Sequence, residues 1–259
     1  MTESDIENEA SRILAAVQER GTDVRFLGGL AVARRCPSAR RHPRLKRTYA
    51  DIDLVARPEQ RKHVTRLLED LGYEPDKSFN DLHGSSRLLF WDVPRDRQID
   101  VFLGIFRMCH TLDLRDRFFD GYDSLPLADI VLTKLQIIEL NEKDARDVLA
   151  VFLDHDLGVQ EEPDLIDVAY LCRVCSVDWG FYTTLTDNLE KLRATSQSVL
   201  DEADHAIVAE RIVRLESELA RAPKTLKWRM RSRMGRRVAW YDLPEEVGDA
   251  SSEAVAREP

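Results

Sequence analysis

The stretch "RTYADIDLVA" at residues 47–56 constrains the fold more than any other part of the sequence. Its apolar residues favour a buried β-strand, yet it contains Asp51 and Asp53 one residue apart. Alternate residues of a strand project from the same face, so the two carboxylates point the same way while Ile52 and Leu54 anchor the strand. Neighbouring carboxylates repel, so one must bind a proton unless a cation lies between them. The stretch therefore predicts a divalent metal site of the kind that Mg²⁺ fills, and the alternative is a strand end with two solvated acids.

A third acid, Asp100, lies inside another apolar run, "QIDVFLG". The neighbours Ile99 and Val101 face the opposite way, so Asp100 projects from one side of its strand. If the two acidic strands are adjacent, the three carboxylates complete a site for two metal ions, roughly 3.5–4 Å apart, that clamps a phosphoryl group. We therefore expect Asp51, Asp53 and Asp100 to be the metal ligands.

Phosphate-binding features surround the first acidic strand. Gly28 and Gly29 lie between a predicted strand and a predicted helix, where glycines let backbone N–H groups approach a phosphate at a helix N-terminus. Arg47 and Thr48 immediately precede the acidic strand. Metal, phosphate and positive charge are therefore predicted to converge from separate segments.

Composition limits the class of protein. The chain has 259 residues, enough for one large domain or two smaller ones, and is 43% hydrophobic and 33% charged, which is typical of a soluble globular protein. No run of 18 apolar residues predicts a membrane span, and the acidic N-terminus lacks a signal-peptide pattern. Four cysteines do not indicate a disulfide framework. We expect a reduced, cytoplasmic protein with no membrane partner.

Positive charge is segregated into two blocks, although the net charge is −9. The first basic block, residues 34–47, has seven Lys or Arg and no acid, and the second basic block, residues 221–237, has eight and no acid. Such segregation indicates a local anionic ligand, such as phosphate or RNA, or else a solvated face. The overall acidity instead favours a cationic acceptor.

The periodicity of apolar residues predicts helix, strand, helix, strand, helix, hairpin and then helices. We expect helices over 4–20, 29–36, 58–73 and 128–140, strands over 23–29 and 50–56, a hairpin of 87–93 with 98–104 and a loop up to residue 46. Asn141 is expected to cap the next helix, and residues 163–234 read as helical. This order predicts an α/β (α+β) fold, a small mixed β-sheet flanked by helices and followed by a helical region.

The motifs "FLGGLAVARR" and "KRTYADIDLV", with Asp100 in "RQIDVFLG", resemble those of the DNA polymerase β-type nucleotidyltransferase superfamily. "LADIVLTKLQII" and "NEKDARDVLAVF" are similar to the third and fourth motifs of bacterial nucleotidyltransferases of the AbiEii and MenT toxin type, and they match Lys134 and the pair Arg146–Asp147. The resemblance covers roughly residues 22–153. Here the glycine motif is G-G where many members have G-S, and Arg34, Arg35 and Arg47 are candidates to replace polar phosphate contacts.

The resemblance implies a nucleotidyltransferase fold and transfer of a nucleoside monophosphate from an Mg²⁺-bound nucleoside triphosphate, such as ATP, to a hydroxyl, with release of pyrophosphate. It implies that Asp51 and Asp53 hold two metal ions, and that Asp100 ligates the second ion or accepts the hydroxyl proton. Gly28 and Gly29 then donate backbone hydrogen bonds to the phosphates, and Lys134 stabilises charge on the leaving pyrophosphate. Asp147 orients Lys134 or contacts the nucleotide, or it is a helix-surface acid.

The acceptor stays open among a small aminoglycoside-like molecule, the 3′ end of a tRNA and a protein side chain. Two other functions also stay open, a non-catalytic nucleotide- or RNA-binding module with the same fold and the toxin of a toxin–antitoxin pair. We expect a catalytic domain over residues 1–155, a C-terminal helical region over 156–242 and a flexible tail over 243–259.

Overall fold

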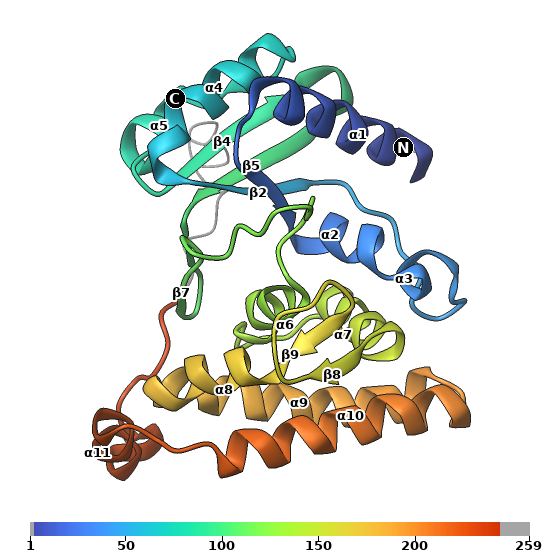
Figure 1. Cartoon of the computed structure of the whole chain (residues 1–259), viewed down its shortest axis with the longest axis vertical. Helices are drawn as coiled ribbons and strands as arrows, with labels where there is room; N and C mark the ends of the chain where they lie inside the picture. Colours follow the sequence, from blue (N-terminus) through green and yellow to red (C-terminus); the bar gives the residue numbers. More distant parts are fainter. Residues whose placement is uncertain (1–2, 244–259) are drawn as a thin grey trace, which may run out of the picture.

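A five-stranded mixed sheet forms one half of the molecule in the computed structural model, which describes residues 3–243 (Figure 1). The order across the sheet is β1-β2-β5-β4-β3. The strands are β1 (Val24–Leu27), β2 (Ile52–Ala56), β3 (Glu74–Pro75), β4 (Arg87–Asp92) and β5 (Arg97–Leu103). Residues 244–259, which hold nearly all of the predicted tail, lie outside the described residues.

The two acidic strands lie side by side at the centre of this sheet. β2 and β5 are parallel, and Asp53 is the register partner of Asp100. β1 pairs antiparallel with β2, and β4 pairs antiparallel with β5 as the predicted hairpin, joined by the 3₁₀-helix η2 (Val93–Arg95). The sheet therefore places the carboxylates predicted to act together on neighbouring strands.

Helices flank the sheet and lead away from it (Figure 1). The N-terminal half contains α1 (Glu3–Arg20), α2 (Gly28–Arg35), α3 (Pro37–Arg41), η1 (Pro58–Gln60), α4 (Arg61–Asp70) and α5 (Lys77–His83). A small hairpin, β6 (Ile105–Arg107) with β7 (Thr111–Asp113), connects the sheet to the rest of the chain. α2 begins directly at the end of β1, so the glycine pair opens this helix.

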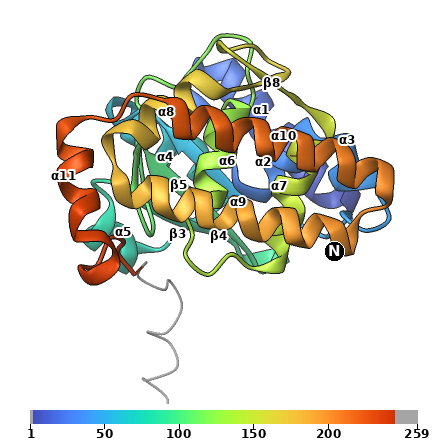
Figure 2. The same ribbon diagram turned by 90° about the horizontal axis from the view of Figure 1, so that it is seen from below.

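The C-terminal half is mainly helical, with α9 and α10 running side by side beneath α6 and α7 (Figures 1 and 2). Its elements are α6 (Leu127–Leu135), α7 (Glu142–Asp154), β8 (Asp156–Gly158), β9 (Leu165–Asp167), α8 (Val168–Val177), α9 (Trp179–Val199), α10 (Glu202–Arg221), α11 (Leu226–Met234) and η3 (Gly235–Arg237). A side chain caps the start of every helix from α7 to α11 by accepting a backbone hydrogen bond, and the caps are Asn141, Asp167, Asp178, Asp201 and Thr225.

Both halves share one hydrophobic core. A contiguous cluster of buried apolar side chains extends from Ile6 in α1 through Leu132 in α6 to Leu215 in α10. Packing of α2 and α3 against α7 joins the halves. The predicted fold class is confirmed: the molecule is a mixed α/β structure with helices on the sheet and a helical region after it.

Three local predictions were wrong. The expected loop up to residue 46 contains α3, because Pro37 occupies the first turn of a new helix as well as ending the previous one. The helix expected over 128–140 ends at Leu135, because the Asn188 side chain donates hydrogen bonds to the carbonyls of Leu135 and Ile137. The stretch expected to be wholly helical from residue 163 begins with β9, which pairs parallel with β8. None of the helices described over residues 3–243 has the length and apolar character needed to cross a bilayer.

Candidate active site

Three carboxylates lie near the place where β2 pairs with β5. Asp53 is on β2, Asp51 directly precedes that strand, and Asp100 is on β5 opposite Asp53. Asp51 is exposed, Asp53 is half-buried and Asp100 is buried. The structure thus brings together all three acids that the sequence singled out.

Arg87 balances the charge of the buried acid. It lies diagonally across the β4–β5 pair from Asp100, and its Nε donates to Asp100 Oδ1 at 2.7 Å while its Nη2 pairs with Oδ2. Gln98 Nε2 donates to Asp100 Oδ2 at 3.4 Å. A bidentate pair with both partners largely buried fixes the orientation of the Asp100 carboxylate.

The backbone of Gly28 lies against the Asp53 carboxylate. Gly28 has φ +66, and a Cβ added there would lie 1.9 Å from Asp53 Oδ2. Only glycine meets both conditions, because any side chain would displace the carboxylate and strain the backbone. The first glycine of the pair is therefore required to bring the start of α2 next to an acidic side chain.

The environment of Asp53 disfavours its charged form. Burial is the main cause, the charges of Asp100 and Asp51 add to it, and Lys134 and Arg87 oppose it; together they raise the pKa of Asp53 to about 7. Burial and Asp100 also raise the pKa of Asp51, although Lys143 and Arg47 oppose the shift. Asp53 is therefore disfavoured as an isolated carboxylate here, mainly because it is buried.

Asp147 of α7 joins two cations next to this site. It accepts a bidentate pair from Arg47, with Nε–Oδ1 at 2.7 Å and Nη2–Oδ2 at 2.6 Å, and lies 2.9 Å from Lys134 Nζ. Lys134 also pairs with Asp144 at 2.5 Å. Burial opposes the charge on Lys134, but Asp147 and Asp144 outweigh it and raise its pKa. Lys134 is therefore held as a cation between two carboxylates.

Arg47 lies over the second glycine of the pair. A Cβ added at Gly29 would lie 2.3 Å from Arg47 Nη2 and 2.8 Å from the ring of Tyr49. The Arg47 guanidinium stacks 4.0 Å from the centre of that ring. Because Gly29 has no side chain, a guanidinium can sit at the N-terminus of α2, where the helix dipole already attracts anions.

Two residues predicted to contact phosphate, Arg35 and Thr48, make other contacts in the structure. Arg35 pairs with the carbonyl of Pro163, donates to Ser124 Oγ at 3.4 Å and lies 4.0 Å from Asp164, so it braces the segment before β9. Thr48 is exposed, and its carbonyl accepts a hydrogen bond from Arg47 at 3.1 Å. None of these contacts is with Asp51, Asp53 or Asp100.

Sequence reasoning missed Arg87, Asp144 and Tyr49. Asp144 is three residues before Asp147 on one face of α7, so the spacing in "NEKDARD" is the signal that both acids face Lys134. Arg87 has no such local signal, because its contact with Asp100 depends on the register of β4 against β5.

The carboxylates fit a divalent cation in chemistry. They are hard oxygen donors, and an ionised carboxylate retains lone pairs for a metal while it accepts hydrogen bonds from arginine. Burial and two neighbouring carboxylates disfavour the charged form of Asp53 without a cation. In residues 3–243, no three His, Cys, Asp or Glu side chains already surround one point closely enough to form a ready-made metal cluster. A cation would therefore draw Asp51 and Asp53 together.

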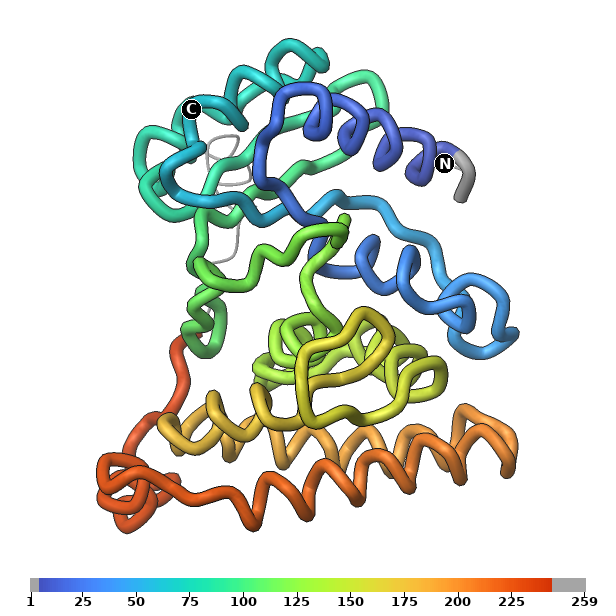
Figure 3. Tube along the Cα trace, viewed as in Figure 1, coloured from blue at the N-terminus to red at the C-terminus, as the bar shows by residue number. Residues whose placement is uncertain are grey.

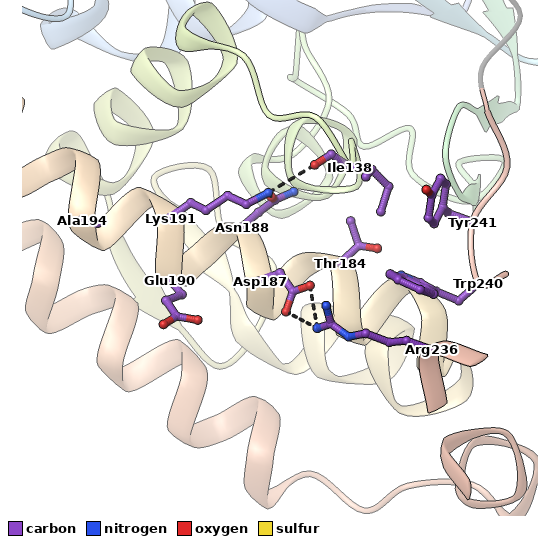
Figure 4. A pocket seen from close by; sticks show the side chains of 10 residues that line it. All are labelled: Ile138, Thr184, Asp187, Asn188, Glu190, Lys191, Ala194, Arg236, Trp240 and Tyr241. Atoms are coloured by element: carbon purple, nitrogen blue, oxygen red, sulfur yellow. Dashed lines mark hydrogen bonds and ion pairs between the residues drawn. The ribbon is translucent and has the colours of Figure 1, made fainter. Parts of the chain in front are cut away.

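A separate hollow of about 600 Å³ lies along α9 (Figure 4). The segment after α6 contributes Ile138 to it, α9 contributes Asp187 and Glu190 among others, and the segment after α11 contributes Trp240 and Tyr241. None of the three strand acids lines it. The hollow and the acidic site are therefore distinct places. α6 carries Lys134, and Ile138 lies in the segment that follows this helix.

Residues 2–150 match the model of a family described as uncharacterised nucleotidyltransferases. The match covers more than half of the chain and includes the acids, the glycine pair, Arg47, Lys134 and Asp147. The chain belongs to this family and is a nucleotidyltransferase. No curated protein sequence matches it.

Several solved structures are similar to the chain at low sequence identity. They include the lincomycin-bound lincosamide antibiotic adenylyltransferase LnuA (17% identity, TM-score 0.40, 57% of this chain and 94% of that chain). They also include the antibiotic-resistance factor ANT(2'')-Ia (16%, 0.41, 67% and 95%). A third is the STING-associated c-di-GMP synthase CdnE from Capnocytophaga granulosa (11%, 0.28, 83% and 80%).

Proposed function

We propose that this nucleotidyltransferase uses Mg²⁺ to transfer a nucleoside monophosphate from a nucleoside triphosphate to an acceptor hydroxyl. The observation that carries the proposal is the register of Asp53 with Asp100 on parallel strands, with the start of α2 against Asp53. Metal ligands and a phosphate-binding helix N-terminus are then adjacent, which is what a metal-bound triphosphate requires.

Asp51 and Asp53 would hold the metal ions, two in the expected arrangement, with Asp100 as a third ligand. When bound, Mg²⁺ supplies charge neutralisation for the triphosphate and polarisation of its α-phosphorus. Arg87 keeps the Asp100 carboxylate oriented through the bidentate pair. The proximity of Asp51 and Asp100 to Asp53 supports this assignment, because a divalent cation would offset the repulsion among the three carboxylates.

Backbone N–H groups of Gly28 and Gly29 would bind the phosphates together with Arg47, which lies over Gly29. Lys134 would stabilise the charge that develops on the departing pyrophosphate. Asp147 orients both cations rather than contacting the nucleotide, because its two oxygens already bind Arg47 and Lys134. Arg35 and Thr48 are not among the residues that we propose to contact the phosphates directly.

The reaction forms one bond and breaks another. The oxygen of the acceptor hydroxyl bonds to the α-phosphorus, the bond from that phosphorus to the bridging oxygen breaks, and pyrophosphate leaves with the bonding electrons. Asp100 serves in one of two ways: it ligates the second ion, or it accepts the proton that the hydroxyl loses. The second role requires Arg87 to release one Asp100 oxygen.

The test is incubation of the protein with each labelled nucleoside triphosphate, Mg²⁺ and a cell extract, with pyrophosphate release and label transfer as readouts. Asp51→Ala and Asp53→Ala should each reduce both signals by about 100-fold or more. Asp116→Ala, at an exposed aspartate, is the matched control and should not change them. A wild-type protein that binds no triphosphate with Mg²⁺ and releases no pyrophosphate would contradict the proposal. One that binds triphosphate but releases no pyrophosphate would be a non-catalytic binding module.

We further propose a relationship to the AbiEii and MenT type, supported by the direct contact between the third-motif Lys134 and the fourth-motif Asp147. A toxin role would require growth arrest on expression that is lost in Asp53→Ala.

We also propose that the chain divides into residues 1–155 and 156–242, which share one core. We propose a cytoplasmic location, where nucleoside triphosphates are available and thiols such as the free Cys36 and Cys175 stay reduced.

A further inference from the structure

The outer face of α11 is unusual in an acidic protein because four cations on α11 and η3 have no partner among the described residues. Four side chains are exposed and form no ion pair or hydrogen bond with residues 3–243, namely Lys227, Arg229, Arg233 and Arg237. No acid occurs between residues 221 and 237. Figures 1 and 2 show α11 at one corner of the molecule, where a large partner can reach it.

The inner face of the same helix is docked on the protein. Trp228 packs edge-on against Tyr182 of α9 with ring centres 5.4 Å apart, and Arg231 stacks 4.7 Å from Trp179. Arg231 also donates to the carbonyls of Gly235, Val238 and Ala239. The helix is therefore fixed in place, and its exposed cations form a defined surface rather than part of a loose segment.

Apolar side chains lie among these cations. Leu226, Met230 and Met234 follow a four-residue spacing on one stripe of α11 and are 66%, 59% and 48% exposed. A partner must therefore offer anionic groups and apolar surface together. An unpaired nucleic-acid strand offers both, because its phosphates are charged and its base faces are open, whereas a duplex hides the base faces.

The hollow beside α9 continues this surface. The chain leaves α11 through Arg236, which binds Asp187 at 2.6 Å, and places the rings of Trp240 and Tyr241 on the hollow (Figure 4). The Trp240 Nε1 atom is buried and has no hydrogen-bond partner in residues 3–243. Aromatic rings at the edge of a hollow suit the stacking of a base.

We propose that the outer face of α11 binds the phosphodiester backbone of a single-stranded nucleic acid, whose end enters the aromatic hollow. RNA and DNA strands share the backbone charge and the base faces, so both are sources of this ligand. The inference goes beyond the proposed function, because none of the three acids lines the hollow.

The test is fluorescence anisotropy with a labelled 12-nucleotide single strand, as RNA and as DNA, without nucleotide or Mg²⁺ and over a range of salt concentrations. The variant Lys227→Gln/Arg229→Gln/Arg233→Gln/Arg237→Gln should bind at least tenfold more weakly. The slope of log K against log salt should become shallower by about 3, since each lost phosphate contact contributes about 0.7. Tyr241→Leu should weaken binding without changing this slope.

The control variant is Arg61→Gln/Lys62→Gln/Arg66→Gln/Lys77→Gln, which removes four exposed cations from α4 and α5, where Glu69 and Asp70 are interspersed. It should bind like the wild type. Equal losses in both variants, unchanged binding in the α11 variant, or wild-type binding to anionic phosphatidylserine vesicles but to neither strand would overturn the proposal. Because the assay has no nucleotide, Asp53→Ala should retain binding, so failure here is distinct from failure of the transfer reaction.

Discussion

The two basic blocks of the sequence look alike but are neutralised differently in the fold. Most of the first basic block is paired inside the protein. Arg34 lies 2.7 Å from Asp123 and 3.1 Å from Glu7, and Arg47 forms the bidentate pair with the buried Asp147. Only Arg41 and Arg44 of this block are exposed without such contacts in residues 3–243.

The second basic block makes few contacts with acids. Arg236 pairs with Asp187, and Arg221 lies 3.4 Å from Glu218 at the surface. Lys224 and Arg231 donate to backbone carbonyls, and the remaining four cations are free in the described part of the chain. The density of basic residues along the sequence therefore does not distinguish a structural and phosphate-binding block from a surface that binds a partner. The positions of the acidic residues in the fold distinguish the two.

The largest difference between the blocks should appear when their acidic partners are neutralised. Asp147→Asn leaves Arg47 and Lys134 with a buried, uncharged partner, and we expect the free energy of unfolding to fall by about 3–5 kcal/mol. Asp187→Asn removes the partner of the exposed Arg236 and should cost under about 1 kcal/mol. Urea unfolding of both variants measures the difference, and equal costs would remove the distinction.

A smaller difference should follow from truncation of the cations themselves. Arg34 is only 19% exposed, pairs with two acids and stacks 5.5 Å from the Phe26 ring, so Arg34→Ala should cost about 1–2 kcal/mol. Arg233→Ala removes an exposed side chain that has no partner within residues 3–243, and it should change stability by less than about 0.5 kcal/mol. Thermal unfolding checks the pair; a cost for Arg233→Ala as large as that for Arg34→Ala would mean that α11 is part of the structural core.

The sequence predicted the local elements of the site better than its long-range contacts. The alternation around Asp53, the strand of Asp100 and the cap Asn141 follow from spacing within a few residues, and the structure places each in the expected element. The pairing of Arg87 with Asp100 depends on strand register, and that of Arg47 with Asp147 joins residues 100 positions apart. No local pattern encodes such contacts, so the different fates of the basic blocks were not predictable.

The smallest expected effect concerns pH and the anchorage of the second basic block. The segment after this block docks where the Asp242 N–H donates to the Cys109 carbonyl, next to the buried His110. Burial lowers the pKa of His110 although Asp178 and Asp242 oppose the shift, and the ring lies 2.8 Å from Thr184 Oγ1. The folded protein therefore binds fewer protons than the unfolded chain below about pH 6.5, so the free energy of unfolding should fall as the pH falls through that value.

Guanidinium and carboxylate groups ordinarily keep their charges between pH 7.5 and 5.5, so the first basic block should stay anchored while the second loosens. At the lower pH, the protection of the Asp242 amide against hydrogen exchange should fall relative to the protection of amides in α2. His110→Gln should abolish this pH dependence, while His63→Gln, at an exposed position of α4, should preserve it. An equal loss of protection at Asp242 and in α2 would mean that the two blocks open together and that His110 does not govern the anchorage of α11.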